Sequence, residues 1–486
     1  MIAIDAGTTG IRSAAVNQAG EIISFSYREF TQHFPQPGWV EHDATEIWET
    51  TMATLTELRK QVDEPVVAVG ITNQRETVVA WDRTTGSPRH RAIVWQDRRT
   101  ASACRALEDA GHLEMIRRRT GLVLDPYFSG TKVAWLLNEG DVSVDNCAVG
   151  TIDSWLIWNL TGGAEHVTEP SNASRTLLFD IDELSFNAEL CDALGVPEHV
   201  LPRVSTTSGT FGVTTREFPF GAGIPISGAA GDQQAALFGQ ACFSAGDTKN
   251  TYGTGSFVVM NLGEDRPDPT DGLLTSVAWT LPGAEPTYCA EGAIFVTGAA
   301  VQWLRDGLGI IEAASDLEAL ALQCNDTGGV MFVPALTGLG SPWWDPNARG
   351  TIVGITRGTG RAEIARAVIE AMVFQTRDVV EAMGASANTT IRRLRVDGGA
   401  SAMNTMLQMQ ADQLGVPVER PVNQQTTVMG AAFLAGIAEG FWDSPADAVK
   451  AWQLDQSFAP AHDADRTSGY QRWLSAVERS LDWADE

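Results

Sequence analysis

The chain carries the same short turn twice, as Ile4-Asp5-Ala6-Gly7-Thr8-Thr9-Gly10 and as Asn250-Thr251-Tyr252-Gly253-Thr254-Gly255. In each copy a short strand leads into a Gly/Thr turn, and a second apolar strand follows, at Ile11–Val16 and at Phe257–Leu262. The copies lie about half the chain apart, which predicts two related domains. We place the boundary so that the first domain covers residues 1–241 and the second covers residues 242–486.

Strands and helices alternate along the rest of the sequence, which is typical of an α/β fold. The first strand opens an antiparallel meander over Met1–Asp5, Ile11–Asn17 and Glu21–Tyr27. Asp43, with Glu46 three residues later, predicts a capping box at the start of a helix that runs to about Lys60. Apolar periodicity predicts further long helices over Ala362–Met383, Met403–Leu414, Met429–Ala438 and Arg466–Trp483.

Composition narrows the class of protein. Of 486 residues, 44% are hydrophobic, which is enough apolar material for large packed cores. The 61 acidic and 34 basic residues give a net charge of -27, which disfavours nucleic acid and membrane surfaces as partners. No apolar run reaches the roughly 20 residues that cross a bilayer, and because Met1–Asp5 already reads as a strand we expect no signal peptide. The 6 cysteines are scattered without a C-x-x-C pair, so we expect a cytoplasmic protein without disulfides or zinc.

The common nucleotide-binding motifs are missing from the sequence. No lysine follows a glycine, which excludes a P-loop, and no G-x-G-x-x-G occurs, which excludes the dinucleotide fingerprint. The two Gly/Thr turns remain, because glycine lets backbone N–H groups approach phosphate oxygens and threonine adds hydroxyl donors. Asp5, at the end of a strand before such a turn, can hold Mg²⁺ through water. Either turn alone is more often an ordinary hairpin. The presence of one such turn in each domain, however, predicts that the two turns bind a polyphosphate from both sides.

Several longer segments carry a resemblance. Asp5-Ala6-Gly7-Thr8-Thr9 resembles the phosphate hairpin of the sugar-kinase/actin/Hsp70 superfamily, and Tyr127–Trp135 and Gly350–Glu370 resemble the signatures of the FGGY carbohydrate kinases. More specific segments are similar to those of the glycerol kinases in that family: PGWVEHDATEIW (37–48), GITNQRET (70–77), AIVWQDRRT (92–100), GLVLDPYFSGTK (121–132), SNASRTLLF (171–179), GDQQAALFGQ (231–240) and KNTYGTGSF (249–257). The resemblance implies two duplicated α/β domains of ribonuclease-H-like (actin-like ATPase) fold, with glycerol and MgATP in the cleft between them.

The resemblance also implies a substrate pocket. Arg75 and Glu76 match residues that bind glycerol hydroxyls, whereas an Arg-Glu neighbour pair is otherwise usually a solvated salt bridge. Trp95, Tyr127 and Phe257 match the apolar wall of that pocket, although aromatic residues are more often core residues. Gln233 matches a further substrate contact.

Asp232 matches the family's general base. Phosphoryl transfer needs the attacking hydroxyl oriented and its proton accepted, and a carboxylate does both. Without the resemblance, helix N-capping is the favoured interpretation of an aspartate at this junction. Asp5 and Asp232 are the expected carboxylates on the Mg²⁺ side of the site.

The nucleotide side is expected to involve residues from both halves: Thr8, Thr9, Gly10, Arg12, Thr254, Gly298, Gln302, Gly399 and Met403. Two departures from the family pattern stand out. Ala6 and Gly10 occupy positions where the family usually carries Gln and Ser, so one hydroxyl donor to phosphate is lost. Met403 occupies a position where an Asn is common.

These matches imply an enzyme of glycerol catabolism that phosphorylates glycerol to sn-glycerol 3-phosphate with Mg²⁺ and ATP, releasing ADP. Two rival functions stay open at this point. One is another FGGY kinase, acting on a pentulose or a four-carbon polyol; the other is an actin- or Hsp70-like ATPase, which would lack the Arg75–Glu76 pair. We expect a homo-oligomer, either a dimer or a tetramer.

Overall fold

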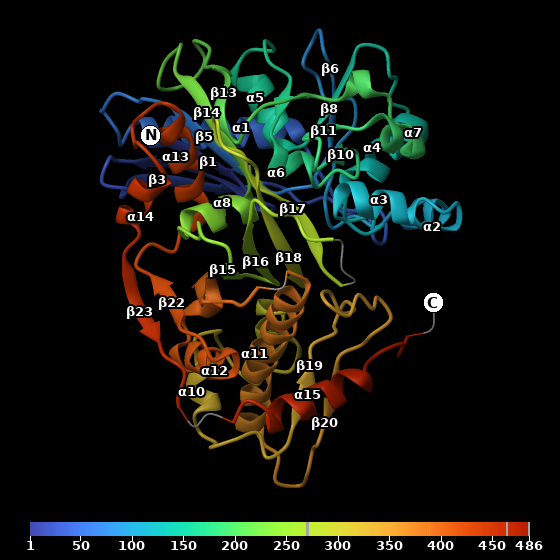
Figure 1. Cartoon of the computed structure of the whole chain (residues 1–486), viewed down its shortest axis with the longest axis vertical. Helices are drawn as coiled ribbons and strands as arrows, with labels where there is room; N and C mark the ends of the chain where they lie inside the picture. The colour runs from blue at the N-terminus through green and yellow to red at the C-terminus, as the bar shows by residue number, and fades with distance from the viewer. Residues whose placement is uncertain (269–271, 388, 463–464, 485–486) are drawn as a thin grey trace.

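Two mixed β-sheets, one from each half of the chain, organise the structure (Figure 1). It is a computed structural model that describes residues 1–268, 272–387, 389–462 and 465–484. The six-stranded first sheet has the order β13 (Ser208–Val213), β14 (Pro225–Gly231), β5 (Val69–Asn73), β1 (Ile2–Ala6), β2 (Gly10–Val16), β3 (Ile22–Glu29). The seven-stranded second sheet has the order β17 (Leu274–Trp279), β18 (Thr287–Ile294), β16 (Ser256–Gly263), β15 (Asp247–Tyr252), β21 (Arg393–Asp397), β22 (Val418–Pro421), β23 (Leu454–Phe458).

The two sheets share a five-strand core of the same topology. In β3-β2-β1-β5-β14 the first three strands are antiparallel, and β5 and β14 join parallel to β1. The same pattern holds in β18-β16-β15-β21-β22. The predicted pair of duplicated ribonuclease-H-like units is therefore confirmed, and the repeated turns join β1 to β2 and β15 to β16.

Residues alternate along β1 between two different environments, as they must in a strand buried on both faces. Ile2 and Ile4 pack into a cluster with Ile47 and Leu55 of α1 (Ala44–Arg59). The intervening small Ala3 packs on the other face, into a cluster shared with α8 (Asp232–Gly239) and α13 (Thr426–Ala438).

The start of α1 differs in part from the expectation. Asp43 caps the helix, because its carboxylate accepts from the backbone N–H groups of Thr45 and Glu46. The predicted capping box is wrong, since the Glu46 carboxylate accepts from the backbone N–H and hydroxyl of Thr31. Glu46 therefore binds Thr31, which is distant in the sequence, instead of the backbone of Asp43.

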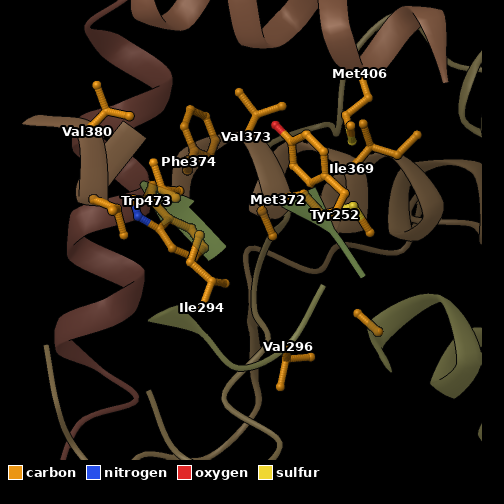
Figure 2. Close-up of a cluster of buried hydrophobic side chains, with 14 of the residues drawn as sticks. Tyr252, Ile294, Val296, Ile369, Met372, Val373, Phe374, Val380, Met406 and Trp473 are labelled. Carbon is orange, nitrogen blue, oxygen red and sulfur yellow. The ribbon is translucent and has the colours of Figure 1, made fainter. Parts of the chain in front are cut away.

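The long helix α11 (Arg361–Ser386) covers the second sheet. Figure 2 shows part of this core, where Ile369, Met372 and Val373 of α11 lie near Tyr252 and Met406. Trp473 of α15 (Ser468–Glu478) closes the same cluster by stacking on Phe374, with ring centroids 5.8 Å apart.

A third layer lies between the sheets and consists of α8 and α13. Although α13 comes from the second half of the sequence, it packs on the first sheet, as Figure 1 shows. The packing is close because it uses glycine: a Cβ at Gly70 would lie 2.1 Å from the carbonyl oxygen of Ala431, and one at Gly430 would lie 1.9 Å from that of Ala235. This layer brings the carboxyl ends of β1 and β14 next to the second sheet.

The other elements surround this core. They are β4 (Glu41–His42), β6 (Val79–Asp82), β7 (Ala92–Ile93), β8 (Cys147–Gly150), β9 (Val167–Thr168), β10 (Phe179–Asp180), β11 (Ser185–Phe186), β12 (Arg203–Val204), β19 (Met331–Val333), β20 (Thr351–Val353), α2 (Ala101–Asp109), α3 (Leu113–Thr120), α4 (Ser129–Asn138), α5 (Ile152–Leu160), α6 (Pro170–Ala173), α7 (Ala188–Leu194), α9 (Gly298–Gln302), α10 (Asp316–Ala321), α12 (Asn404–Leu414) and α14 (Pro445–Ala451), with short 3-10 or π turns at Glu198–Val200, Trp303–Gly307 and Gly399–Ala402. In the described part of the chain, no helix has the length and apolar character needed to cross a membrane.

Candidate active site

The two Gly/Thr turns are tight hairpins at the carboxyl ends of the central strands. The backbone N–H of Gly7 donates to the carbonyl of Gly10 at 3.0 Å, and that of Gly253 donates to the carbonyl of Gly255 at 2.8 Å. Thr9 and Thr254 are exposed at the tips, where their hydroxyls and neighbouring N–H groups are free to receive an anion.

Residues expected on the nucleotide side gather around the second hairpin. A Cβ at Gly298 would lie 2.6 Å from the carbonyl oxygen of Gly253, so only glycine allows α9 to start there. Gly398 (φ 85°) packs equally closely on the backbone of Tyr252 and leaves Gly399 beside open space. Gln302, at the end of α9, is exposed.

Met403 lies just outside the helix that it was predicted to begin. The helix α12 begins at Asn404, and Met403 precedes it as an N-cap residue with extended backbone (φ -81°, ψ 103°). Its side chain is half-buried against the core cluster beneath α11. The predicted helical start at residue 403 is wrong by one residue.

Charged and polar residues form a row across the end of the first sheet. The strand register places Tyr27, Arg12, Asp5 and Thr72 side by side on neighbouring strands. Arg12 Nη1 lies 3.7 Å from Asp5 Oδ2, and the Arg12 guanidinium lies over the Tyr27 ring at 5.4 Å. Burial raises the pKa of Asp5 to about 6; Arg12 opposes this and the charge of Asp232 adds to it.

This row fits MgATP in two respects. The buried Nε of Arg12 and the buried hydroxyl of Thr72 find no hydrogen-bond partner among the described residues. The first is a free donor for a phosphate, and the second is a free group for water bound to a cation. No cluster of three or more metal-ligating side chains occurs in the described ranges.

Arg75 and Glu76 follow β5 and are almost fully buried. Arg75 Nε lies 3.2 Å from Asp232 Oδ1, and Arg75 Nη2 lies 3.5 Å from the Tyr127 hydroxyl. Glu76 has a left-handed backbone (φ 62°), which is uncommon for a non-glycine residue. Such strain is typical of functional sites.

The three expected wall residues come together. Trp95 contacts Tyr127 and Phe257 edge to face, with ring centroids 5.6 Å and 6.4 Å away. Phe257 belongs to β16, so the two halves of the chain share this wall. The Trp95 indole N–H donates to the Thr8 hydroxyl at 3.0 Å, which connects the wall to the first hairpin.

Asp232 is the first residue of α8 and its side chain is 29% exposed. The N-cap position is Gly231, so Asp232 is not the N-cap residue; Asp232 Oδ1 accepts from the N–H of the next residue, Gln233, at 2.8 Å. Burial raises the pKa of Asp232, while Arg75 and Lys249 act in the opposite direction. A carboxylate that is reachable from solvent, with its pKa raised, can accept a proton from a bound hydroxyl.

Lys249 is a buried cation beside this carboxylate that the sequence analysis did not assign. Its ammonium group donates to Gln233 Oε1 and, at 3.0 Å, to the Thr251 hydroxyl. Burial lowers the pKa of Lys249 to about 8, although nearby carboxylates oppose the shift. By holding the Gln233 oxygen, Lys249 leaves the amide nitrogen available as a donor.

Two further charged residues were missed. Arg175 follows α6 and donates from Nε to Glu76 Oε1 at 2.7 Å, and Glu291 of β18 accepts from both Arg75 and Arg175. The sequence does carry a signal for Glu291, which is a charged residue inside the otherwise apolar segment CAEGAIF (289–295). A charge in a buried strand requires a partner.

Known proteins match this chain over nearly its whole length. The models for the N-terminal and C-terminal domains of the FGGY family of carbohydrate kinases match residues 1–239 and 248–439. The chain is 50% identical to glycerol kinase 2 of Thermotoga maritima over 492 residues, covering 99% of each chain. It is 51% identical to the glycerol kinase of Dechloromonas aromatica over 494 residues, covering 100% of this chain and 98% of the relative.

Solved structures of carbohydrate kinases have the same fold as this chain. The crystal structure of Plasmodium falciparum glycerol kinase with ADP superposes with a TM-score of 0.93 at 33% identity, covering 99% of this chain and 98% of that one. The xylulose kinase of Lactobacillus acidophilus superposes with a TM-score of 0.88 at 22% identity, covering 98% of this chain and 96% of that one. At that identity the likeness concerns the fold alone.

Proposed function

Because the chain belongs to the FGGY family of carbohydrate kinases, we propose that it phosphorylates glycerol with ATP, giving sn-glycerol 3-phosphate and ADP. The observation that carries the proposal is the contact between Arg75 and Asp232 beside the wall of Trp95, Tyr127 and Phe257. A charged fork and a carboxylate facing a short apolar wall suit a molecule with hydroxyls along one edge and three carbons along the other. Identity of about 50% to glycerol kinases over the whole chain supports the same substrate.

Each residue of the site has a role in this proposal. Arg75, Glu76 and Gln233 bind the glycerol hydroxyls, and the wall excludes water from the carbon backbone. Asp232 accepts the proton of the attacking hydroxyl. That role is supported by its position directly after β14, next to Arg75 and partly open to solvent. Proton transfer of this kind contributes about 10²–10⁴-fold to a rate.

The nucleotide lies between the hairpins in this proposal. Thr8, Thr9 and Gly10 on one side and Thr254 on the other bind the phosphates, and Arg12 offsets charge that develops on the transferred group. Gly298, Gln302, Gly399 and Met403 form the side where the rest of the nucleotide binds. Asp5 and Asp232 would hold Mg²⁺ through its waters, and the ion would supply further neutralisation of phosphate charge.

Two coarser properties accompany the activity. We place the protein in the cytoplasm, which the free state of all 6 cysteines supports. We also expect a dimer or tetramer, because the edge strand β3 exposes Ile23 (46%), Phe25 (57%) and Tyr27 (42%) on one face. Exposed apolar edge strands favour association.

The product of the reaction tests the function. We expect ³¹P NMR of the protein with MgATP and glycerol to show one equivalent of a terminal phosphomonoester for each ADP formed. Without glycerol, ATP should persist. Formation of ADP and inorganic phosphate at the same rate with and without glycerol would contradict the proposal.

A further inference from the structure

A continuous chain of alternating charges connects the residues proposed to bind glycerol. It runs Asp232–Arg75–Glu291–Arg175–Glu76. The connecting distances are 3.2 Å for Arg75 Nε to Asp232 Oδ1, 2.9 Å for Arg75 Nη2 to Glu291 Oε1, 3.2 Å for Arg175 Nη2 to Glu291 Oε1, and 2.7 Å for Arg175 Nε to Glu76 Oε1. All except Asp232 are buried.

The central member comes from the opposite half of the chain. Glu291 lies on β18 of the second sheet, whereas the other members follow β5, α6 and β14 of the first half. Its direct neighbours on the adjacent strands, Val259 and Leu274, are both apolar. Ser276, on β17 of the same sheet, accepts from Arg175 Nη1 at 3.1 Å. The second sheet therefore holds Arg75 and Arg175, which both come from the first half.

Stability alone does not explain this carboxylate. Burial by itself would raise the pKa of Glu291, but Arg175 and Arg75 outweigh it and hold the pKa at about 2. A buried ion pair seldom stabilises a fold more than apolar residues of the same volume would, whereas removing one partner leaves a costly unpaired charge. What the arrangement does provide is orientation.

Hydrogen bonds on one side of the Arg75 guanidinium fix its orientation. Glu291 accepts from both Nη atoms of this guanidinium, and Gln234 Oε1 accepts from Nη1 at 3.2 Å. The contacts on the side of the site, from Nε to Asp232 at 3.2 Å and from Nη2 to the Tyr127 hydroxyl at 3.5 Å, are longer than the 2.9 Å from Nη2 to Glu291 Oε1. A substrate hydroxyl can replace these contacts while Glu291 keeps the guanidinium in place.

We propose that Glu291 is a positioning residue for the polyol site, which aims Arg75 directly and Glu76 through Arg175. Since Glu291 belongs to the second sheet, a competent acceptor site forms only when the two halves are in contact. This inference rests on the proposed function, because it identifies the acceptor site with the glycerol site.

The Glu291→Gln variant tests the inference, since it keeps the shape of the side chain and removes its charge. Arg75 is then expected to turn toward Asp232 and compete with the substrate. We expect the KM for glycerol to rise at least about tenfold, while the KM for ATP changes by less than about twofold. Asp378→Asn is the matched control: it neutralises a buried carboxylate of the same half that accepts from Tyr470, Trp473 and Trp343. It should lower the melting temperature and leave the KM for glycerol unchanged.

A double-mutant cycle separates positioning from a general structural effect. In an Arg75→Ala background, Glu291→Gln should raise the KM for glycerol by a clearly smaller factor than in wild type, because only the path through Arg175 to Glu76 is left. If Glu291→Gln fails to fold, Glu291→Asp keeps the charge but retracts it by one methylene, and should raise the KM for glycerol by an intermediate factor.

The outcomes distinguish the inference from the function on which it rests. Wild-type protein without glycerol-dependent turnover would overturn both. An active wild type with an unchanged KM for glycerol in the Glu291 variants would overturn the inference alone. Equal rises in the KM values for glycerol and ATP, or the same effect in the Arg75→Ala background, would also overturn it.

Discussion

Asp232 occupies the one position in the alternating charge chain that solvent reaches. Arg75 and Lys249 lie close enough to affect its pKa, and its Oδ1 already accepts from the backbone of Gln233. These contacts fix the carboxylate through Oδ1, and Oδ2 has no hydrogen-bond partner among the described residues. A fixed, reachable oxygen is what a general base requires.

Asp232→Asn should therefore abolish transfer and preserve binding. The amide still hydrogen-bonds a hydroxyl but does not accept its proton, so we expect kcat to fall on the order of 10²–10⁴-fold. Steady-state kinetics and calorimetric titration with glycerol measure the two effects. A variant that keeps more than about a tenth of wild-type kcat would show that another group accepts the proton.

Met403→Asn should tighten ATP binding by less than about tenfold. The asparagine amide offers a donor and an acceptor to a nucleotide, and one such neutral hydrogen bond contributes about 0.5–1.5 kcal/mol. Loss of the thioether packing against the core offsets part of the gain. Titration with an ATP analogue measures this change, and Met403→Leu, which adds no amide, is the control. Weaker binding in the Asn variant would place residue 403 away from the nucleotide.

His42 connects the first hairpin to the interior. It is fully buried, and its ring nitrogens lie 2.6 Å from Gln32 Oε1 and 3.4 Å from Gln74 Nε2. The amide nitrogens of the same two glutamines donate to the carbonyls of Thr8 and Gly7. Burial lowers the pKa of His42 to about 3, and His33 adds to the shift.

This shift predicts loss of stability in acid. The unfolded chain takes up a proton at His42 near pH 6.5, whereas the folded chain does not until about pH 3. The contribution of His42 to the free energy of unfolding is therefore complete above pH 6.5. It decreases below that pH, by about 1–2 kcal/mol at pH 5. Between pH 7 and 5 the urea midpoint of wild type should fall further than that of His42→Gln. His462→Gln, at an exposed histidine, should follow wild type. Parallel pH profiles for wild type and His42→Gln would refute the assignment.

At the scale of elements, the contact between α8 and α13 positions the Asp232 carboxylate. Helix α8 begins at Asp232, and α13 packs so closely that a Cβ at Gly239 would lie 1.9 Å from the carbonyl oxygen of Thr426. The clashing atom of Thr426 is a backbone oxygen, so no change of side-chain rotamer can relieve the contact.

Gly430→Ala tests this contact. Its Cβ would lie 1.9 Å from the carbonyl oxygen of Ala235, so the helices must separate and α8 must move with Asp232. We expect both the melting temperature and kcat to fall, with overpacking of this kind costing about 1–3 kcal/mol or more. Gly358→Ala is the control, because the nearest atom to its Cβ, the Thr356 hydroxyl oxygen, is 3.7 Å away. Normal melting and turnover in Gly430→Ala would mean that the helices tolerate separation.

Local sequence patterns predicted the helices and strands better than the tertiary contacts between them. The repeated Gly/Thr turns were predictable because their residues impose the hairpin, and both hairpins occur as expected. The packing of α13 on the first sheet was not predictable. Its residues are apolar on nearly every side, so no periodic face indicates which sheet it contacts.

The site shows the same division. Arg75, Trp95 and Asp232 lie in segments whose resemblance to a known family identified them, and the structure brings them together. The partnership of Arg175 with Glu291 joins residues 116 positions apart on different halves, and no local spacing encodes it. Glu46 failed as a capping residue for a similar reason, because Thr31 offered two donors that the local pattern does not show.

At the scale of the whole molecule, the two sheets contribute complementary parts of the proposed site. The first supplies Asp5, Arg12, Arg75 and Asp232, and the second supplies Phe257, Glu291 and the second hairpin. Binding of an acceptor between them should couple the halves, and an ATPase without an acceptor would have no use for the buried Arg75–Glu291 contact.

The acceptor dependence of ADP release decides between these alternatives. We would measure kcat/KM in a coupled assay with glycerol, with D-xylulose, and with no acceptor, at saturating MgATP. We predict rapid release with glycerol, kcat/KM at least about 100-fold lower with D-xylulose, and only background release without an acceptor. Equal release in all three conditions, or a preference for D-xylulose, would contradict a glycerol site between the two sheets.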